Sequence, residues 1–276
     1  TASSNTAVGA APMSANTTGS QNTALGFNSL PLNTTGTGST AIGYQALLSN
    51  TTGTNTGIGY QALYSNTTGT SNTSVGLNSG FSATTGDQNT YLGISAGENV
   101  TGGSHNTLIG ANAGDAANIG STTAVGHDCL TSVTGDENTA IGEAALQSVT
   151  SGSRNSGLGR AAGENMTTGS DNVAIGRDSM DNISTGSQNV AIGNSTSLSS
   201  AGGVNQIVMG QNVTCSGNSN FTFGDGSNDS NIAFGATSIT APSDIRLKED
   251  IQDQEAGLSF INDLRPVTFR WKKEKD

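Results

Sequence analysis

The sequence has few charged and few aromatic residues. Of 276 residues, 11% are charged and 4% are aromatic, whereas a typical globular chain has about 25% charged residues. The net charge is −11, and the first charged residue is Asp87. Residues 1–242 contain three basic side chains, Arg154, Arg160 and Arg177. Without a basic stripe on this part of the chain, nucleic acid is not an expected partner.

Cysteine and histidine are also scarce. Cys129 occupies a position held by Ala or Ser in most other repeats, so a buried small thiol is favoured over a disulfide or a metal site for it and for Cys215. His105 and His127 lack the spacing of metal ligands and are expected on the surface. We therefore expect no metal and no cofactor.

Several functional signatures are missing as well. The sequence contains no apolar run long enough to span a membrane and no signal peptide. It begins inside a repeat, so we expect it to be part of a longer protein. Residues 1–242 contain no paired catalytic carboxylates, no His-based triad and no phosphate loop, so we expect no enzymatic activity there.

What the sequence does have is a repeat related to Asn-Thr-Ala-Ile-Gly. Its glycine recurs 16 or 17 residues apart up to Gly210, and then at shorter intervals. An apolar residue always precedes the glycine, and Asn stands four residues before it in 12 of the 15 copies. The glycines are Gly9, Gly26, Gly43, Gly59, Gly76, Gly93, Gly110, Gly126, Gly142, Gly159, Gly176, Gly193, Gly210, Gly224 and Gly235. Such a period indicates a repeat architecture.

One repeat predicts one coil of a β-solenoid. In the repeat 39–53, Ser39–Ile42 and Gln45–Leu48 are expected to form two short strands, and Asn50–Gly53 closes the coil. A second glycine such as Gly53 recurs ten residues after the first in most repeats, and we expect Asn and Gly to supply positive-φ corners. Gly, Asn and Thr dominate, and these residues disfavour helix formation.

The alternation within the strand predicts two faces. Thr and Ile point one way and Asn and Ala the other, and we assign the Ile position to the coil interior. On this assignment, Ile175→Asp should destabilise the coil strongly and Asn182→Ala should not. Two or three buried aliphatic residues return less free energy than ordering each coil costs, so we expect three coils to pack around an axis as a homotrimer.

Two polar patterns have alternative interpretations. Asn16, Asn33, Asn50 and Asn66 match the glycosylation sequon, but turn chemistry that repeats with the coil explains them better. Acidic residues near turns, such as Asp136 and Asp225, could suggest calcium, but the repeated Gly-Gly-x-Gly-x-Asp pattern of calcium solenoids is absent. Solvated turns are the favoured interpretation.

The composition changes towards the end of the chain. Residues 1–210 are expected to form the solenoid, and 211–242 a narrowing cap and connector in which Phe221–Phe234 replaces the aliphatic residues. The first lysine is Lys248. Within 243–276, the pattern predicts a helix over 255–264 and a strand over 267–271, a small α+β segment.

This last segment resembles the start of the endosialidase-type intramolecular chaperone domain of phage tail fibres and tailspikes. The resemblance rests on Ser243-Asp244-Ile245-Arg246-Leu247-Lys248 and on the following Leu-x-x-Ile-x-x-Leu-x-Pro-Val-x-Phe-x-Trp pattern (258–271). It implies a chaperone that drives trimerisation and cuts itself off before Asp244, with Ser243 as nucleophile and Lys248 as its base. The family domain is longer than this segment, which implies an incomplete copy. A merely structural trimeric neck is the alternative.

The repeats, from Asn5 to about Gly210, resemble the left-handed β-roll heads of YadA-like trimeric adhesins, whose motif also reads Asn-x-x-Ala-Ile-Gly. This resemblance implies a left-handed parallel β-roll, all-β and trimeric. Together the two resemblances imply a virion tail fibre or extracellular fibre that contacts a cell-surface glycan or protein receptor through its polar turns or the Phe221–Phe234 region. A purely structural spacer and a Thr-based ice- or mineral-binding surface are the alternatives.

Overall fold

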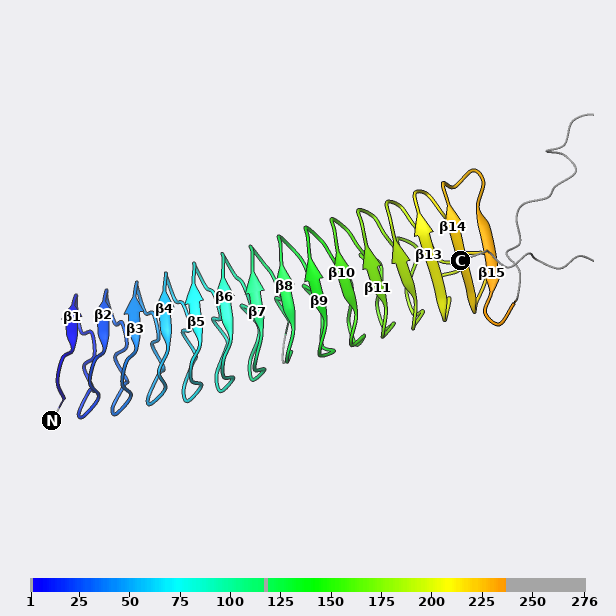
Figure 1. The fold of residues 1–276 in the computed structure, drawn as a ribbon. Helices are drawn as coiled ribbons and strands as arrows, with labels where there is room; N and C mark the ends of the chain where they lie inside the picture. Colours follow the sequence, from blue (N-terminus) through cyan, green and yellow to red (C-terminus); the bar gives the residue numbers. More distant parts are fainter. Residues whose placement is uncertain (1, 117–118, 237–276) are drawn as a thin grey trace, which may run out of the picture. The chain divides into compact units, whose positions relative to one another are not determined.

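The computed structural model describes residues 2–116 and 119–236, which form a β-solenoid (Figure 1). This part of the chain contains fifteen strands and no helix, which confirms the predicted all-β solenoid with coils of about 17 residues. The helix and strand expected within 243–276 lie outside the described residues. The strands are β1 (Thr6–Val8), β2 (Thr23–Leu25), β3 (Thr40–Ile42), β4 (Thr56–Ile58), β5 (Thr73–Val75), β6 (Thr90–Leu92), β7 (Thr107–Ile109), β8 (Thr123–Val125), β9 (Thr139–Ile141), β10 (Ser156–Leu158), β11 (Val173–Ile175), β12 (Val190–Ile192), β13 (Gln206–Gly210), β14 (Asn220–Gly224) and β15 (Ser230–Ala233).

The strands form one sheet in sequence order, and each pairs with the next (Figure 1). Pairing from β1 to β14 is parallel and in register, so that Thr40 stands beside Thr56 and Ile42 beside Ile58. β15 turns back and pairs antiparallel with β14. Identical positions of successive coils therefore stack into columns that run along the solenoid.

Each coil contributes one strand, and the prediction of two strands per coil was wrong. The run Gln45–Leu48 forms a turn in which Gln45 and Leu47 both have positive φ, 54° and 53°. Two left-handed residues separated by one ordinary residue cannot form an extended strand. The turn instead buries Ala46 and Leu47 completely.

The assignment of the strand faces was also wrong. Ala41, the middle residue of β3, is fully buried in the coil, while Thr40 and Ile42 point outward and are partly exposed. The same pattern holds for most of β2–β12. The interior opposite the small strand residue is filled by the large residue of the turn, such as Leu47, so the strand has no room for a large inward side chain.

In two coils the strand carries the large buried residue and the turn carries the small one. Tyr91 and Leu108 occupy the position that is small elsewhere, and both are fully buried. In an ordinary coil the facing turn carries a large residue such as Leu47. In the coils next to Tyr91 and Leu108, the same turn position holds glycine, at Gly80, Gly97 and Gly114. A Cβ built on Gly97 would lie 2.5 Å from Cδ1 of Tyr91 and 3.0 Å from Cδ1 of Leu108. A bulky strand residue is thus accommodated by glycines in the facing turns.

The two recurring glycines have different roles. Gly43 has φ +135°, and a Cβ there would clash with the backbone of Gly59 in the next coil. The second glycine, Gly53, does not have positive φ. A Cβ on Gly53 would clash with the Gly69 carbonyl oxygen, so this position requires glycine for the close approach of coils rather than for a corner.

Candidate functional site

The recurring asparagine ties successive coils together from inside. Asn155 is buried, its Nδ2 donates to the carbonyl oxygen of Gly169 at 2.8 Å, and its Oδ1 accepts the backbone N–H of Asn172 at 3.0 Å. Equivalent bonds link most coils from Asn5 to Gln206. The asparagine therefore satisfies buried backbone groups and is not a positive-φ corner, so that expectation was wrong.

The sequon asparagines form a second internal column. Asn33, Asn50 and Asn66 are completely buried. Nδ2 of Asn50 donates to the carbonyl oxygen of Gly53 at 3.2 Å, closing a turn within its own coil, and Asn16 and Asn33 make the same bond at 3.0 Å. The turn interpretation is confirmed for Asn16, Asn33 and Asn50. In this fold the three buried amides are inaccessible to a glycosylating enzyme.

The cysteines and histidines form no reactive cluster. Cys129 and Cys215 are both free and buried, and burial raises the pKa of the Cys129 thiol to about 11. His105 and His127 are exposed. Within residues 2–116 and 119–236, no three His, Cys, Asp or Glu side chains are grouped so that they could hold a metal ion.

The charged residues lie in exposed pairs and turns. Nε and Nη2 of Arg154 donate to the Asp171 carboxylate at 2.6 and 2.9 Å, and this bonding lowers the pKa of Asp171. The Asp225 carboxylate accepts the backbone N–H groups of Ser227 and Asn228, which lowers its pKa. These contacts match the predicted solvated turns.

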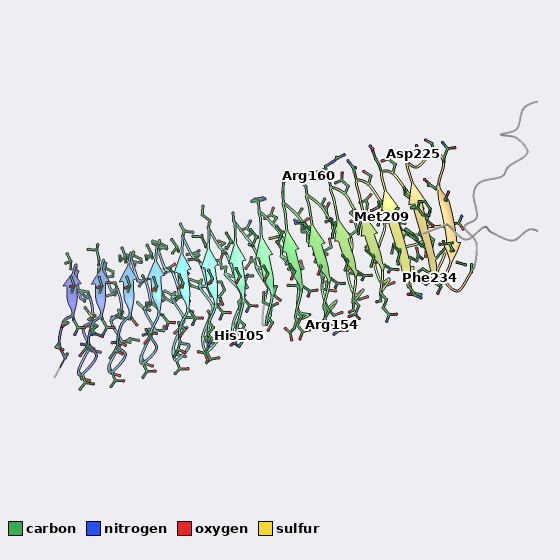
Figure 2. The ribbon with its side chains drawn as sticks, in the orientation of Figure 1. His105, Arg154, Arg160, Met209, Asp225 and Phe234 are labelled. Atoms are coloured by element: carbon green, nitrogen blue, oxygen red, sulfur yellow. The ribbon has the colours of Figure 1, made fainter. Side chains whose placement is uncertain are left out.

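The feature that the sequence analysis missed is an apolar column on the outer face of the sheet. The last residue of each three-residue strand and the equivalent Met209 of β13 point away from the coil, and six of the thirteen are exposed by 40% or more of their surface. Figure 2 shows Met209 on this face. The column comprises Val8, Leu25, Ile42, Ile58, Val75, Leu92, Ile109, Val125, Ile141, Leu158, Ile175, Ile192 and Met209. The recurrence of an apolar residue was visible in the sequence, but its direction was not.

A parallel column of threonine lies on the same face. Thr stands at the first position of every strand from β1 to β9, and these side chains are partly or fully exposed. The position becomes Ser156 in β10 and then Val173 and Val190. The outer face thus presents alternating hydroxyl and aliphatic columns, without any charged side chain in β1–β13.

The predicted self-cleavage residues Ser243, Asp244 and Lys248 lie outside the described residues, so the structure does not test them. The predicted contact region Phe221–Phe234 is described. Phe221 and Phe223 lie with ring centroids 5.0 Å apart, and Phe234 is 42% exposed. No further feature of this region indicates a ligand.

Comparison with known protein families gives a match at the end of the chain. Residues 243–276 match the family model described as chaperone of endosialidase. No curated protein and no solved structure matches the chain. The match supports a fibre protein with a C-terminal chaperone, whereas the resemblance of the repeats to YadA-like heads gains no support. In the described residues, we find no helix of the length and apolarity needed to cross a membrane.

Proposed function

We propose that the chain is a subunit of a homotrimeric fibre that adheres to a target cell surface, on a virion tail or another extracellular fibre, with a C-terminal chaperone that assembles the trimer. The observation that carries this proposal is the exposed apolar column on the outer face of β1–β13. The chaperone match at 243–276 supports the same assignment independently.

The apolar column is not needed to fill the coil. The interior is already occupied by fully buried residues such as Ala41 and Leu47 in one coil and Ala174 in another. A continuous apolar strip on a water-exposed surface favours association, because burying the strip removes apolar area from water. Three copies placed around an axis parallel to the column would each bury the same strip, which gives a closed symmetric assembly.

The test compares substitutions at neighbouring positions of β11. Ile175→Asp places a carboxylate on the outer face, so three carboxylates would meet at one level of the trimer axis. We expect this variant to keep its β-sheet circular dichroism but to sediment as a smaller species. Ala174→Asp buries a charge inside the coil and should lower the melting temperature even in the isolated subunit.

Gln188→Asp is the control, because Gln188 is exposed and lies outside the strands. This variant should remain trimeric. A wild-type chain that sediments as a monomer, or an Ile175→Asp variant that assembles as well as the Gln188→Asp variant, would contradict the proposed interface.

The threonine column favours a second candidate, binding to ice or a mineral through a flat hydroxyl array. The nine threonines that begin β1–β9 lie on a regular strand face. This function requires the outer face to be open, so it excludes a trimer closed through that face. Thermal hysteresis by a monomeric chain would favour it. A structural spacer remains the alternative if electron microscopy places target contact outside this chain.

A further inference from the structure

A second exposed column runs along one rim of the sheet. It is formed by the residue that follows each repeat glycine. In five successive coils this residue is large, apolar and exposed: Phe27 (47%), Tyr44 (42%), Tyr60 (48%), Leu77 (46%) and Ile94 (59%). The rings of Phe27, Tyr44 and Tyr60 stack with centroids 5.4 and 5.1 Å apart and planes within 12° of parallel. We refer to these five residues as the rim ladder.

The trimer interface proposed above does not account for the rim ladder. In later coils the same position holds His127, Glu143, Arg160 and Arg177, all of them exposed. Figure 2 shows Arg160 at the edge of the sheet where the strands end, away from Met209 on the face. Burying these charged side chains would be costly, so the rim must face water in the later coils. Because the coils stack in register, the same rim faces water in the earlier coils too.

The surroundings of the rim ladder are polar and nearly uncharged, although the Glu98 carboxylate accepts a hydrogen bond from Nδ2 of Asn78 at 3.4 Å. Residues 1–86 contain no charged side chain. Amides occupy the next position along the chain, and Nε2 of Gln61 donates to Oε1 of Gln45 at 2.9 Å. Asn28 and Asn78 hold the same position in the coils on either side, and all four amides are partly exposed. The rim therefore offers apolar ring edges, two phenol groups and a row of neutral amides.

We propose that the rim ladder binds a neutral, hydroxyl-rich polysaccharide that lies along the solenoid. This proposal rests on the proposed adhesive function and names its ligand class. Residues 1–98 contain no basic side chain to pair with an anionic partner. Aromatic edges, in contrast, pack against the apolar C–H groups of a sugar, and amides bond its hydroxyls. The stacked rings cover one another's faces, so the contacts are made by edges and are individually weak.

The repetition of the rim ladder favours a polymer over a single sugar. Rungs recur with the coil rise, about 4.8 Å, so a linear chain can contact several rungs at once. Three copies of the rim ladder in a fibre multiply the weak contacts into useful avidity. Since no ion pair contributes, binding should change little with salt concentration.

Affinity electrophoresis of the full chain tests this proposal. Native gels would contain dextran, amylose or mannan as neutral polysaccharides, and heparin as the charged comparison. We expect at least one neutral polysaccharide to slow the protein equally at low and high salt. Tyr44→Ser/Tyr60→Ser should weaken this retardation about tenfold or more. Arg160→Ser/Arg177→Ser, at the same rim position in later coils, should leave it unchanged.

The proposal is overturned if no neutral polysaccharide slows the wild-type chain, if heparin alone does so, or if the double tyrosine variant is slowed as much as wild type. Sedimentation of the same samples separates this failure from failure of the assembly. A trimer that does not bind contradicts only the rim ladder, whereas a monomer contradicts the proposed fibre.

Discussion

The asparagine that precedes most strands links neighbouring coils in addition to its place in a turn. Asn155 supplies an acceptor to the backbone of the next coil and a donor to a buried carbonyl group. Its substitution would leave both backbone groups unsatisfied, at about 1–3 kcal/mol each. Because the asparagine is buried, water cannot replace either bond.

We therefore predict that Asn155→Ala destabilises the solenoid by about 2–4 kcal/mol, measured as a lower melting temperature or urea midpoint. The control is Asn165→Ala, since the Asn165 side chain is exposed and bonds Asp181 at the surface. Asn165→Ala should cost less than about 1 kcal/mol. Equal shifts for the two variants would contradict an internal asparagine ladder.

Relieving backbone strain at a single residue should stabilise the solenoid. Gln88 is exposed and has φ 57°, a left-handed conformation that costs an ordinary residue about 1–2 kcal/mol. Gly38 already occupies the equivalent position three coils earlier, with φ 69°. Gln88→Gly should therefore raise stability by roughly 0.5–1 kcal/mol after its entropic cost.

Gln88→Ala separates this backbone effect from loss of the side chain. Alanine keeps the strain, so its melting temperature should not rise above that of the wild type. If both variants are stabilised alike, the gain comes from the side chain and not from φ.

The sequence indicated the repeat well and the strand faces poorly, for a physical reason. The period predicts a short strand just before each repeat glycine, because a regular spacing indicates coils of equal length that stack on one another. The direction of a three-residue strand is a weaker signal, since the outer face is also apolar. Ile42 was assigned to the interior because large aliphatic residues are usually buried. Only the position of Leu47 across the coil shows that the interior space beside Ala41 is already filled.

At the level of the element, turn and strand share one fixed interior volume. Tyr91 and Leu108 can be read from the sequence as large residues at a position that is small in most repeats, but the compensating glycines lie in turns where the sequence predicted strands. Gly97 lies between the two large side chains. Leucine at the equivalent position elsewhere adopts the same backbone, as Leu47 does with φ 53°. Volume, more than φ, therefore excludes a large residue at position 97.

We predict that Gly97→Leu alone destabilises the protein by more than about 3 kcal/mol, because overpacking displaces both neighbours. The triple variant Tyr91→Ala/Leu108→Ala/Gly97→Leu restores the ordinary arrangement of small strand and large turn residues. Its melting temperature should recover at least half of the loss. A triple variant less stable than the single one would show that the two volumes are not coupled.

At the level of the whole molecule, coil and assembly have separate apolar surfaces. The interior column from Ala24 to Ala191 holds each coil together, and the outer column from Val8 to Met209 is available for association. The interior itself changes along the chain. The buried position of Asn33, Asn50 and Asn66 holds an aliphatic side chain in later coils, at Val133, Val149 and Ile183. The two halves differ both inside and at the rim, although the repeat motif is the same.

The parallel topology of the solenoid favours assistance during folding of the proposed trimer. Every strand except the last pairs with a parallel neighbour one coil away, so no coil is stable until another has formed, and unpaired strand edges are exposed meanwhile. A chaperone at the C-terminus, which the match at 243–276 supports, could hold three chains together during this period. Its removal afterwards would make the assembled state kinetically stable, because the chains could not regain their register after unfolding.

We therefore predict that the precursor, expressed to its natural C-terminus, cuts itself between Ser243 and Asp244. A neutral lysine can take the hydroxyl proton of a serine and make the serine oxygen nucleophilic, and Lys248 follows Ser243 by five residues.

Mass spectrometry should find a product that ends at Ser243, and Ser243→Ala and Lys248→Met should each abolish this product. Ser238→Ala, on the N-terminal side of Pro242, is the matched control and should be cut normally. If the wild type stays full length, or Ser243→Ala is cut as readily, residues 243–276 are a trimeric neck without the dyad. The uncut Ser243→Ala fibre should still assemble but unfold reversibly, because it keeps the segment that aligns its three chains.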